Sequence, residues 1–316
     1  MRTSNFWFSI DRSEEMMAII QRPIYWIGSF LLIGACDGES GSGKDGGKSG
    51  VDTDCVADCL DKGYDQTTCD KACVGFSAKE EGDDKDWGDQ VTTQEIIIDN
   101  VVREYHMFAP TNPLEEDLAL LVAVHGGDEA DYYFPQSIAF EHLAEEEGIV
   151  IIYPHAKQVR DNEGAWQLNT DSQSQQDIEF IGALIDDIST RYAIDEARVY
   201  AMGHSLGSMF CYELVCQMSF RFAAVASHGG SMPVTPTSCN QTRNVPIMHI
   251  HGVDDSIIPY SQTWHWKSWD SVGTMRDIPG LIDYWEDKYN CQNATDNGPP
   301  NSIHIVHDQC EEDARV

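Results

Sequence analysis

Residues 199–209 read VYAMGHSLGSM, and this stretch decides the fold. The apolar residues before Gly203 are typical of a buried β-strand, and a helix is predicted to begin at Leu206. Between them, Gly203, Ser205 and Gly207 form a Gly-x-Ser-x-Gly pattern, in which a strand turns sharply into a helix and presents a serine at the turn. Glycine suits both flanking positions because a Cβ would clash in so tight a turn. Ser205 is therefore a candidate nucleophile, and the alternative is an ordinary serine that caps a helix.

Strands and helices alternate on both sides of this turn, from residue 93 to residue 316. The run LALLVAVH at residues 118–125 is continuously apolar, as in a strand buried on both faces of a sheet. The alternation predicts an α/β protein with a mostly parallel, doubly wound sheet, whose ligands bind beyond the carboxyl ends of the strands. The predicted strands are Glu95–Ile98, Val101–Phe108, Leu118–His125, Ile149–Tyr153, Arg198–Met202, Phe222–Ala226 and Val245–His251, and the predicted helices are Gln136–Glu147, Asp177–Tyr192, Leu206–Gln217 and Leu281–Tyr289.

The strand that ends at His125 is followed by two glycines, Gly126 and Gly127. Glycine lets the backbone approach a substrate closely, and the N–H of Gly127 could form an oxyanion hole together with the N–H of Leu206. We interpret His125 itself as a packed core residue rather than a catalytic one.

Asp254 and Asp255 follow the strand Val245–His251. A carboxylate here, after the nucleophile along the chain, suits the Ser…Asp…His order of α/β-hydrolases. Its role would be to orient the catalytic base and to stabilise the imidazolium. Only one of the two aspartates can fill this role, and the other is expected to lie in a solvated turn.

From about Arg103 onward, the chain resembles the secreted polyhydroxybutyrate depolymerase/feruloyl esterase family of α/β-hydrolases. The resemblance implies an α/β-hydrolase fold, a serine esterase that forms an acyl-enzyme on polymer-linked esters, and no cofactor or metal. It does not choose between feruloyl or acetyl esters of polysaccharides and polyhydroxyalkanoates. The matching stretches are Arg103–Pro110, Leu120–Gly127, Ile149–His155, Asp177–Asp187, Ile194–Met209, Arg221–Ala226 and Pro246–Tyr260.

The resemblance also assigns roles to individual residues. Ser205 matches the nucleophile, Asp255 matches the triad acid, and Asp254 is its neighbour in the turn. Trp166 matches a tryptophan that the family often carries near the substrate cleft, so we predict a substrate-binding role for it.

The family's catalytic histidine follows a late cysteine and one more strand. Here only six residues follow Cys310, so we interpret the sequence as truncated at the C-terminus and this chain as deficient in its base. Three histidines come after Asp255, and none has the matching context: His265, His304 and His307.

Cysteines of the catalytic segment are predicted to form disulfides. Cys291 and Cys310 match cysteines that are paired in the family, so the resemblance implies a Cys291–Cys310 bond. Cys216 and Cys239 could pair with each other, which would leave Cys211 over as a buried thiol.

The N-terminal 35 residues are interpreted as a lipoprotein-type signal peptide. Ile24–Ala35 is an uncharged apolar run of 12 residues, which is too short to span a bilayer and suits a signal-peptide core. It ends in Ile-Gly-Ala-Cys, which resembles a lipobox and predicts a lipid on Cys36. Residues 36–50 are rich in Gly and Ser and read as a flexible tether. The chain is therefore expected to be exported and anchored to a bacterial membrane, with plain secretion and a transmembrane anchor as alternatives.

Residues 51–76 contain two Cys-x3-Cys pairs, which place the cysteines of each pair on one helix face. Two antiparallel helical turns would pair Cys55 with Cys73 and Cys59 with Cys69. The alternative is a four-thiolate metal site, which an exported chain and the three-residue spacing disfavour. Residues 77–92 read as a charged linker before the catalytic segment 93–316.

The chain is strongly acidic, with a formal net charge of −33. Such a surface repels phosphate backbones, so nucleic-acid binding is not expected. The predicted partners are an ester substrate and, through the lipid, a membrane. Besides an esterase, two hypotheses stay open: a serine peptidase of related fold, and a surface protein that binds a polymer without catalysis.

Overall fold

The structure is a computed structural model that describes residues 90–111, 117–127, 140–160, 163–169, 176–265, 272–296 and 304–316. The predicted signal peptide, Cys36, the tether, the four-cysteine hairpin and nearly all of the linker lie outside these residues. The first residues of the helix predicted from Gln136 also lie outside them.

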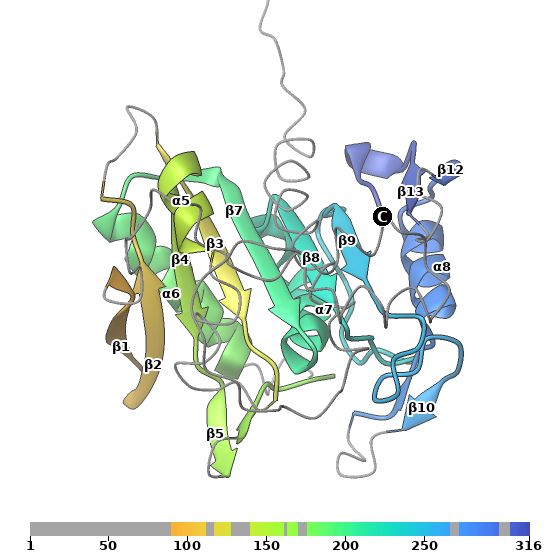
Figure 1. The fold of residues 1–316 in the computed structure, drawn as a ribbon, viewed down its shortest axis with the longest axis horizontal. Coiled ribbons are helices and arrows are strands. Elements are labelled where there is room, and N and C mark those ends of the chain that lie inside the picture. Colours follow the sequence, from red (N-terminus) through yellow and green to blue (C-terminus); the bar gives the residue numbers. More distant parts are fainter. Residues whose placement is uncertain are drawn as a thin grey trace, which may run out of the picture.

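A seven-stranded sheet forms the centre of the fold, in the order β1-β2-β4-β3-β7-β8-β9 (Figure 1). β2 pairs antiparallel with β1 and β4, and the remaining neighbours pair in parallel. The mostly parallel α/β sheet predicted from the sequence is therefore confirmed. The strands are β1 (Thr92–Ile98), β2 (Val101–Phe108), β3 (Leu118–Val124), β4 (Ile149–Pro154), β7 (Ile194–His204), β8 (Ala224–His228) and β9 (Ile247–Ile250).

Helices cover both faces of the sheet, with α5 on one side and α6 and α7 on the other (Figure 1). Every residue of β3 is buried, and successive side chains enter opposite apolar clusters because a strand alternates its faces. Leu120, Val122 and Val124 join the cluster of α6, α7 and α8, whereas Ala119, Leu121 and Ala123 join that of α5. The helices are α5 (Glu141–Glu147), α6 (Gln176–Arg191), α7 (Leu206–Met218) and α8 (Ile278–Lys288).

Several short elements were not predicted. β5 pairs with β6, β10 with β11, and β12 with β13, each pair antiparallel and outside the main sheet. Polar segments such as NATD in β12 carry no apolar alternation, so the sequence pattern does not distinguish them from loops. Their bounds are β5 (Lys157–Arg160), β6 (Glu163–Ala165), β10 (Trp264–His265), β11 (Thr274–Met275), β12 (Asn293–Asp296) and β13 (Ile305–Asp308), with the 3-10 turns η2 (Ser219–Arg221) and η3 (Glu311–Asp313).

Two disulfides join parts of the chain that are distant in sequence. Cys291 bonds to Cys310, as expected, and Cys216 of α7 bonds to Cys239. Cys211 is a free, fully buried thiol, and burial raises its pKa, so it has the character of an inert core residue.

The last residues of the chain lie between β9 and β13 (Figure 1). The N–H of Ile247, the first residue of β9, donates to the carbonyl of Arg315 at 2.9 Å. Val316 and His307 exchange backbone hydrogen bonds of 2.8 and 3.1 Å. Residues 315 and 316 thus lie beside β9, at its amino end. None of the helices in the described part of the chain combines the length and apolar character needed to cross a bilayer.

Candidate active site

Ser205 occupies the single-residue turn between β7, which ends at His204, and α7, which begins at Leu206. Its φ is 51° and its ψ is −114°, a region that side-chain-bearing residues rarely adopt. The turn is held by the N–H of Ser205, which donates to the carbonyl of His228 at 2.8 Å. The side chain makes no capping hydrogen bond, so Ser205 is not an ordinary helix cap.

The two glycines of the motif are required by close backbone contacts. A Cβ on Gly203 would collide with the backbone of Gly207, and a Cβ on Gly207 would collide with the carbonyls of Val124 and His125. The start of α7 therefore packs directly against the end of β3. The contact that forms the turn also brings the end of β7 next to the His125–Gly127 segment.

Replacing Gly207 by alanine is expected to destabilise the protein by about 1–3 kcal/mol or more, because backbone must move to make room for the methyl group. Gly182, in the interior of α6, is the matched control. A Cβ there meets only the end of Met218, at an ordinary 3.8 Å, so Gly182→Ala should stabilise by roughly 0.5–1 kcal/mol through helix propensity. Denaturant titration of both variants tests this, and equal stabilities would contradict the packing argument.

The amides of Gly127 and Leu206 lie beyond the carboxyl ends of neighbouring strands. Val124 of β3 pairs with Gly203 of β7, so both segments leave the sheet at the same level. Within the described residues, neither amide donates a backbone hydrogen bond. Among the residues that the structure describes, none lies within 4 Å of a Cβ built on Gly127.

His125 and Trp166 fix the segment that carries Gly127. His125 is buried, and its Nε2 accepts the N–H of Ala156 at 3.0 Å. Its Nδ1 then carries the hydrogen and donates to the carbonyl of Gly126 at 2.5 Å. Trp166 donates from Nε1 to the carbonyl of His125 at 3.0 Å. His125 is thus a buried residue with a structural role, as expected.

Trp166 differs from its predicted place. Its side chain is only 1% exposed and stacks on Phe210, with ring centroids 4.7 Å apart. The buried indole supports the His125 segment through its hydrogen bond to the His125 carbonyl. The described contacts of Trp166 are those of a positioning residue. Its ring packs against an aromatic neighbour, and its N–H has a hydrogen-bond acceptor, as a buried indole requires.

Asp254 and Asp255 differ in their surroundings. Asp255 Oδ1 accepts the N–H groups of Ile257 and Ile258, both at 2.8 Å, and its Oδ2 lies 3.5 Å from Nε2 of His251. Asp254 is exposed. The fixed carboxylate is therefore that of Asp255.

His251 is an unsuitable base despite its contact with Asp255. Its side chain is 1% exposed, and Nε2 lies 2.8 Å from the carbonyl of Ile258, to which it donates. Burial lowers the pKa of His251, while the Ile258 hydrogen bond and Asp255 oppose this shift. Nε2 of His251, which carries the proton, therefore already donates a hydrogen bond within the loop that contains Asp255.

His307 lies far from Ser205 along the sheet. His307 is bonded to Val316, which adjoins the start of β9 at Ile247. Ile247 is level with Val225, and Val225 with Ala201, four residues before Ser205. The four residues from Ala201 to Ser205 span about 13 Å along the strand. Among the residues that the structure describes, no hydrogen bond joins the Ser205 hydroxyl to an imidazole.

The sequence did not predict a buried network of polar side chains near Ser205. The Tyr212 hydroxyl lies 2.8 Å from Nδ1 of His249, and Ser227 Oγ lies 3.2 Å from the same nitrogen. Ser227 also contacts Ser208 in the first turn of α7. Burial lowers the pKa of His249 to about 3, with smaller effects from neighbouring histidines, so the ring is neutral and accepts from Tyr212. The network ties α7 to β8 and β9.

A buried ion pair supports the Trp166 segment and was also not foreseen. Arg103 of β2 contacts Asp177 of α6 at 2.9 Å, with side chains 10% and 2% exposed. Asp177 Oδ2 also accepts the N–H of Gln167 at 2.8 Å, and the Asp177 N–H donates to Gln167 Oε1 at 3.0 Å. Both ion-pair residues begin or lie within stretches quoted for the family resemblance, but their contact spans 74 residues, which no local pattern reveals.

Comparison with known proteins gives one family. Residues 103–257 match the family described as "Esterase PHB depolymerase". The chain is 30% identical over 194 residues to the bifunctional acetylxylan esterase/xylanase XynS20E of Neocallimastix patriciarum, covering 61% of this chain and 25% of that protein. It is 22% identical over 159 residues to feruloyl esterase B of Piromyces equi, covering 48% and 29%. The chain thus spans about a quarter of the length of these two curated relatives.

A solved structure of an acetyl xylan esterase from Aspergillus awamori is 20% identical, with a TM-score of 0.37, and the match covers 44% of this chain and 52% of that one. A mostly parallel sheet in this strand order, with a serine in the turn after β7, defines an α/β-hydrolase. The family match over residues 103–257 and the similarity to curated esterases support the assignment of this segment to the polyhydroxybutyrate depolymerase/feruloyl esterase family of that fold.

Proposed function

We propose that this chain is the core of a carboxylic-ester hydrolase that uses Ser205 as its nucleophile. Ser205 Oγ would attack the ester carbonyl and form an acyl-enzyme, which water then hydrolyses. The amides of Gly127 and Leu206 would hold the oxyanion of each tetrahedral intermediate. Asp255 would orient the histidine base and stabilise its imidazolium, provided that a base reaches Ser205.

The observation that carries this proposal is the backbone of Ser205. Its φ of 51° costs free energy, of order 1–3 kcal/mol for a strained residue, and the clashes at Gly203 and Gly207 show that the surroundings enforce the turn. A strained serine that caps nothing, beside two amides without backbone acceptors, fits a nucleophile next to an oxyanion hole. The helix N-terminus at Leu206 adds a favourable dipole for the developing negative charge.

The proposed substrate class is an ester linked to a polymer. Two relatives are named for acetylxylan and feruloyl ester hydrolysis, and the family description names polyhydroxybutyrate depolymerase. We propose feruloyl or acetyl polysaccharide esters, or polyhydroxyalkanoates, as the candidates to assay.

A non-catalytic polymer-binding protein is the second candidate. The absence of an imidazole hydrogen bond to Ser205 among the described residues favours it. The two candidates differ in whether the site accelerates ester cleavage at all.

The test compares ester and amide hydrolysis by the 316-residue chain. We expect aryl acetates and methyl ferulate to be cleaved about 10³–10⁴-fold faster than in buffer, because binding and the oxyanion hole act without a base. A peptide anilide should not be cleaved faster than in buffer. Faster amide cleavage would favour a peptidase, and polymer binding without ester acceleration would favour the second candidate.

Two variants of Gly127 test the oxyanion hole within the same assay. Gly127→Ala keeps the amide, whereas Gly127→Pro removes it, and a Cβ at this position meets no described neighbour within 4 Å. We expect the proline variant to be about 10²–10³-fold slower than the alanine variant, the usual effect of losing one such donor. Equal rates in two variants with the same melting temperature would exclude this amide from the hole.

We also propose that the chain is exported and anchored through a lipid on Cys36, which rests on the lipobox-like sequence. Each buried acyl methylene contributes about 0.8 kcal/mol to anchoring. Mass spectrometry of protein extracted from bacterial membranes should show a mature chain that begins at a diacylated Cys36, and Cys36→Ser should abolish processing and partition into detergent. An exported chain with an unmodified Cys36 would contradict the anchor.

A further inference from the structure

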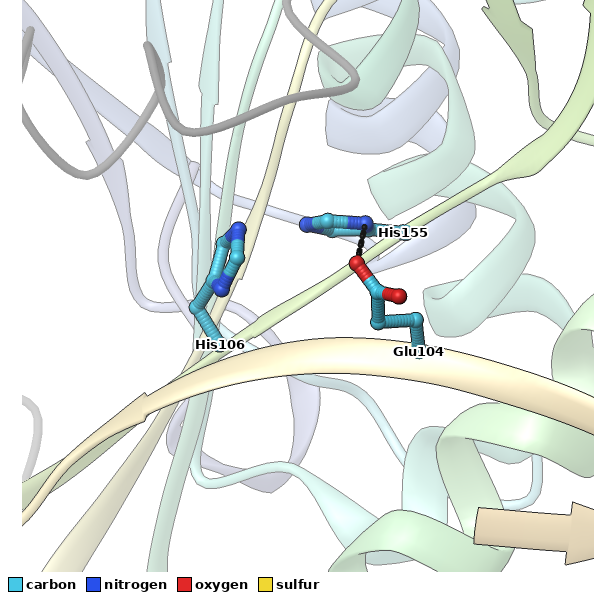
Figure 2. A group of neighbouring side chains, drawn as sticks. All are labelled: Glu104, His106 and His155. Carbon is cyan, nitrogen blue, oxygen red and sulfur yellow. Dashed lines mark ion pairs between the residues drawn. The ribbon is translucent and has the colours of Figure 1, made fainter. Parts of the chain in front are cut away.

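We propose that Glu104, His106 and His155 form a binding site for a divalent transition-metal ion, with Zn²⁺ as the best-matched ion. Glu104 and His106 stand two residues apart on β2 and so share one face of the sheet. His155 follows the end of the neighbouring strand β4. Figure 2 shows the three side chains converging, with the two imidazoles next to each other and the Glu104 carboxylate beside His155.

The spacing of the donor atoms suits zinc. One ligand atom from each residue lies within 4.8 Å of the other two. Nδ1 of His155 lies 3.3 Å from Oε1 of Glu104. Two donors that bind a tetrahedral zinc ion at about 2.0–2.1 Å lie about 3.3–3.4 Å apart, so this pair already has the separation of bound ligands. The imidazoles of His106 and His155 meet edge to face, with ring centroids 4.4 Å apart. A small rotation of a ring would bring all three donor atoms to the distances of bound ligands.

The backbone around the three ligands is fixed before any ion binds. The N–H of His155 donates to the carbonyl of Glu104 at 3.0 Å, which locks the two strands in register. The carbonyl of His155 accepts from Arg103 at 3.0 Å. Rigid elements hold ligands more precisely than loops do, so little ordering entropy opposes binding.

Thr93 provides an outer partner for one ligand. Its Oγ1 lies 3.1 Å from Nδ1 of His106, on the neighbouring strand β1. When Nδ1–H donates to this hydroxyl, Nε2 carries the lone pair and would be the atom that binds the metal. Metal-binding histidines typically have their second nitrogen fixed in this way.

Charge and access also favour a cation. Glu104 brings a negative charge, and the neighbouring cation Arg103 is neutralised by Asp177. His106 is 1% exposed, His155 15% and Glu104 46%, so the site is most accessible to solvent at Glu104. Two imidazoles and one carboxylate leave a fourth position for water, as in zinc sites with three protein ligands.

The site adjoins the candidate oxyanion segment. Ala156, the residue after His155, donates its N–H to Nε2 of His125, whose ring in turn contacts Gly126. An ion that holds His155 therefore also steadies the support of Gly127. The effect of the ion on Gly127 rests on the proposed function. Metal binding itself is measured without an assay of catalysis.

The test titrates the chelator-treated full chain with Zn²⁺ in competition with a chromophoric chelator, and with Co²⁺ as a spectroscopic probe. We expect one site of micromolar or tighter affinity, with visible Co²⁺ bands of a four-coordinate N/O site. Glu104→Gln should weaken this site at least 10-fold, His155→Gln at least 100-fold and Thr93→Val about 10-fold. Zn²⁺ should also raise the melting temperature of the wild type more than that of Glu104→Gln.

The matched control is Glu146→Gln on α5. Glu146 lies 3.5 Å from His142, both side chains are more than half exposed, and the pair is not part of a three-ligand cluster among the described residues. Glu146→Gln should leave the affinity unchanged. Zinc bound through cysteines elsewhere would persist in every variant and would not mask the difference. If Zn²⁺ and Co²⁺ bind equally well to wild type, Glu104→Gln and His155→Gln, or do not bind, the cluster is an ion pair only and the proposal is wrong.

Discussion

A chain continued beyond Val316 by the strand and the histidine that the family resemblance implies is expected to hydrolyse aryl esters at an ordinary enzyme rate of about 10 s⁻¹. The 316-residue chain should stay near the residual acceleration of about 10³–10⁴ over water. The reason is that Ser205 has no hydrogen-bonded imidazole among the described residues, and a serine without a base is a poor nucleophile.

The geometry of the last residues explains why such a strand would supply the base. The carbonyl of Arg315 accepts the N–H of Ile247 at the start of β9. A strand that continues from this point parallel to β9 ends at the same edge of the sheet as Ser205 and Asp255. A histidine in the turn after it would then lie between the nucleophile and the Asp255 carboxylate, as in the Ser…Asp…His order.

Two substitutions make this prediction specific. In the continued chain, Ser205→Ala should remove nearly all the gained rate, and Asp255→Asn should lower kcat by up to about 10⁴-fold because the base loses its orientation. In the 316-residue chain, the same substitutions should change the residual rate little, because the members of a triad act as a unit. A 316-residue chain that already turns over an aryl ester at about 10 s⁻¹ would show that a described histidine is the base.

Local patterns predicted the part of the site that depends on local structure. The Gly-x-Ser-x-Gly motif marks the turn at Ser205 because the strained φ of 51° and the glycine contacts arise within a few residues. The main strands were predicted for a similar reason, since β3 and β4 are continuous apolar runs. The Cys291–Cys310 disulfide followed from the family resemblance, not from spacing.

Long-range contacts set the limit of prediction. Trp166 was expected beside the substrate, but the hydrogen bond to His125 and the stacking on Phe210 bury it. The Glu104–His106–His155 cluster depends on the pairing of β2 with β4, which brings residues about fifty positions apart into contact. Motif patterns do not contain strand order, so neither feature could be read from residue spacing.

The Arg103–Asp177 ion pair is such a contact, and Asp177→Asn is expected to destabilise the protein by about 3–5 kcal/mol. Asparagine has nearly the same shape, so the loss comes from Arg103, which is left as a buried charge between His155 and the ring of Phe180. Asp186→Asn, on the same helix, is the matched control.

The comparison between the two aspartates separates burial from ion pairing. Asp186 pairs with Arg221, but its side chain is 63% exposed, whereas that of Asp177 is 2% exposed. An exposed pair contributes about 0–1 kcal/mol, so Asp186→Asn should shift the urea midpoint little. Asp177→Asn should shift the midpoint strongly with an unchanged slope, which indicates a change in stability alone. If both variants unfold at the same midpoint, the buried pair does not stabilise the fold, and the Trp166 segment must be held by its other contacts.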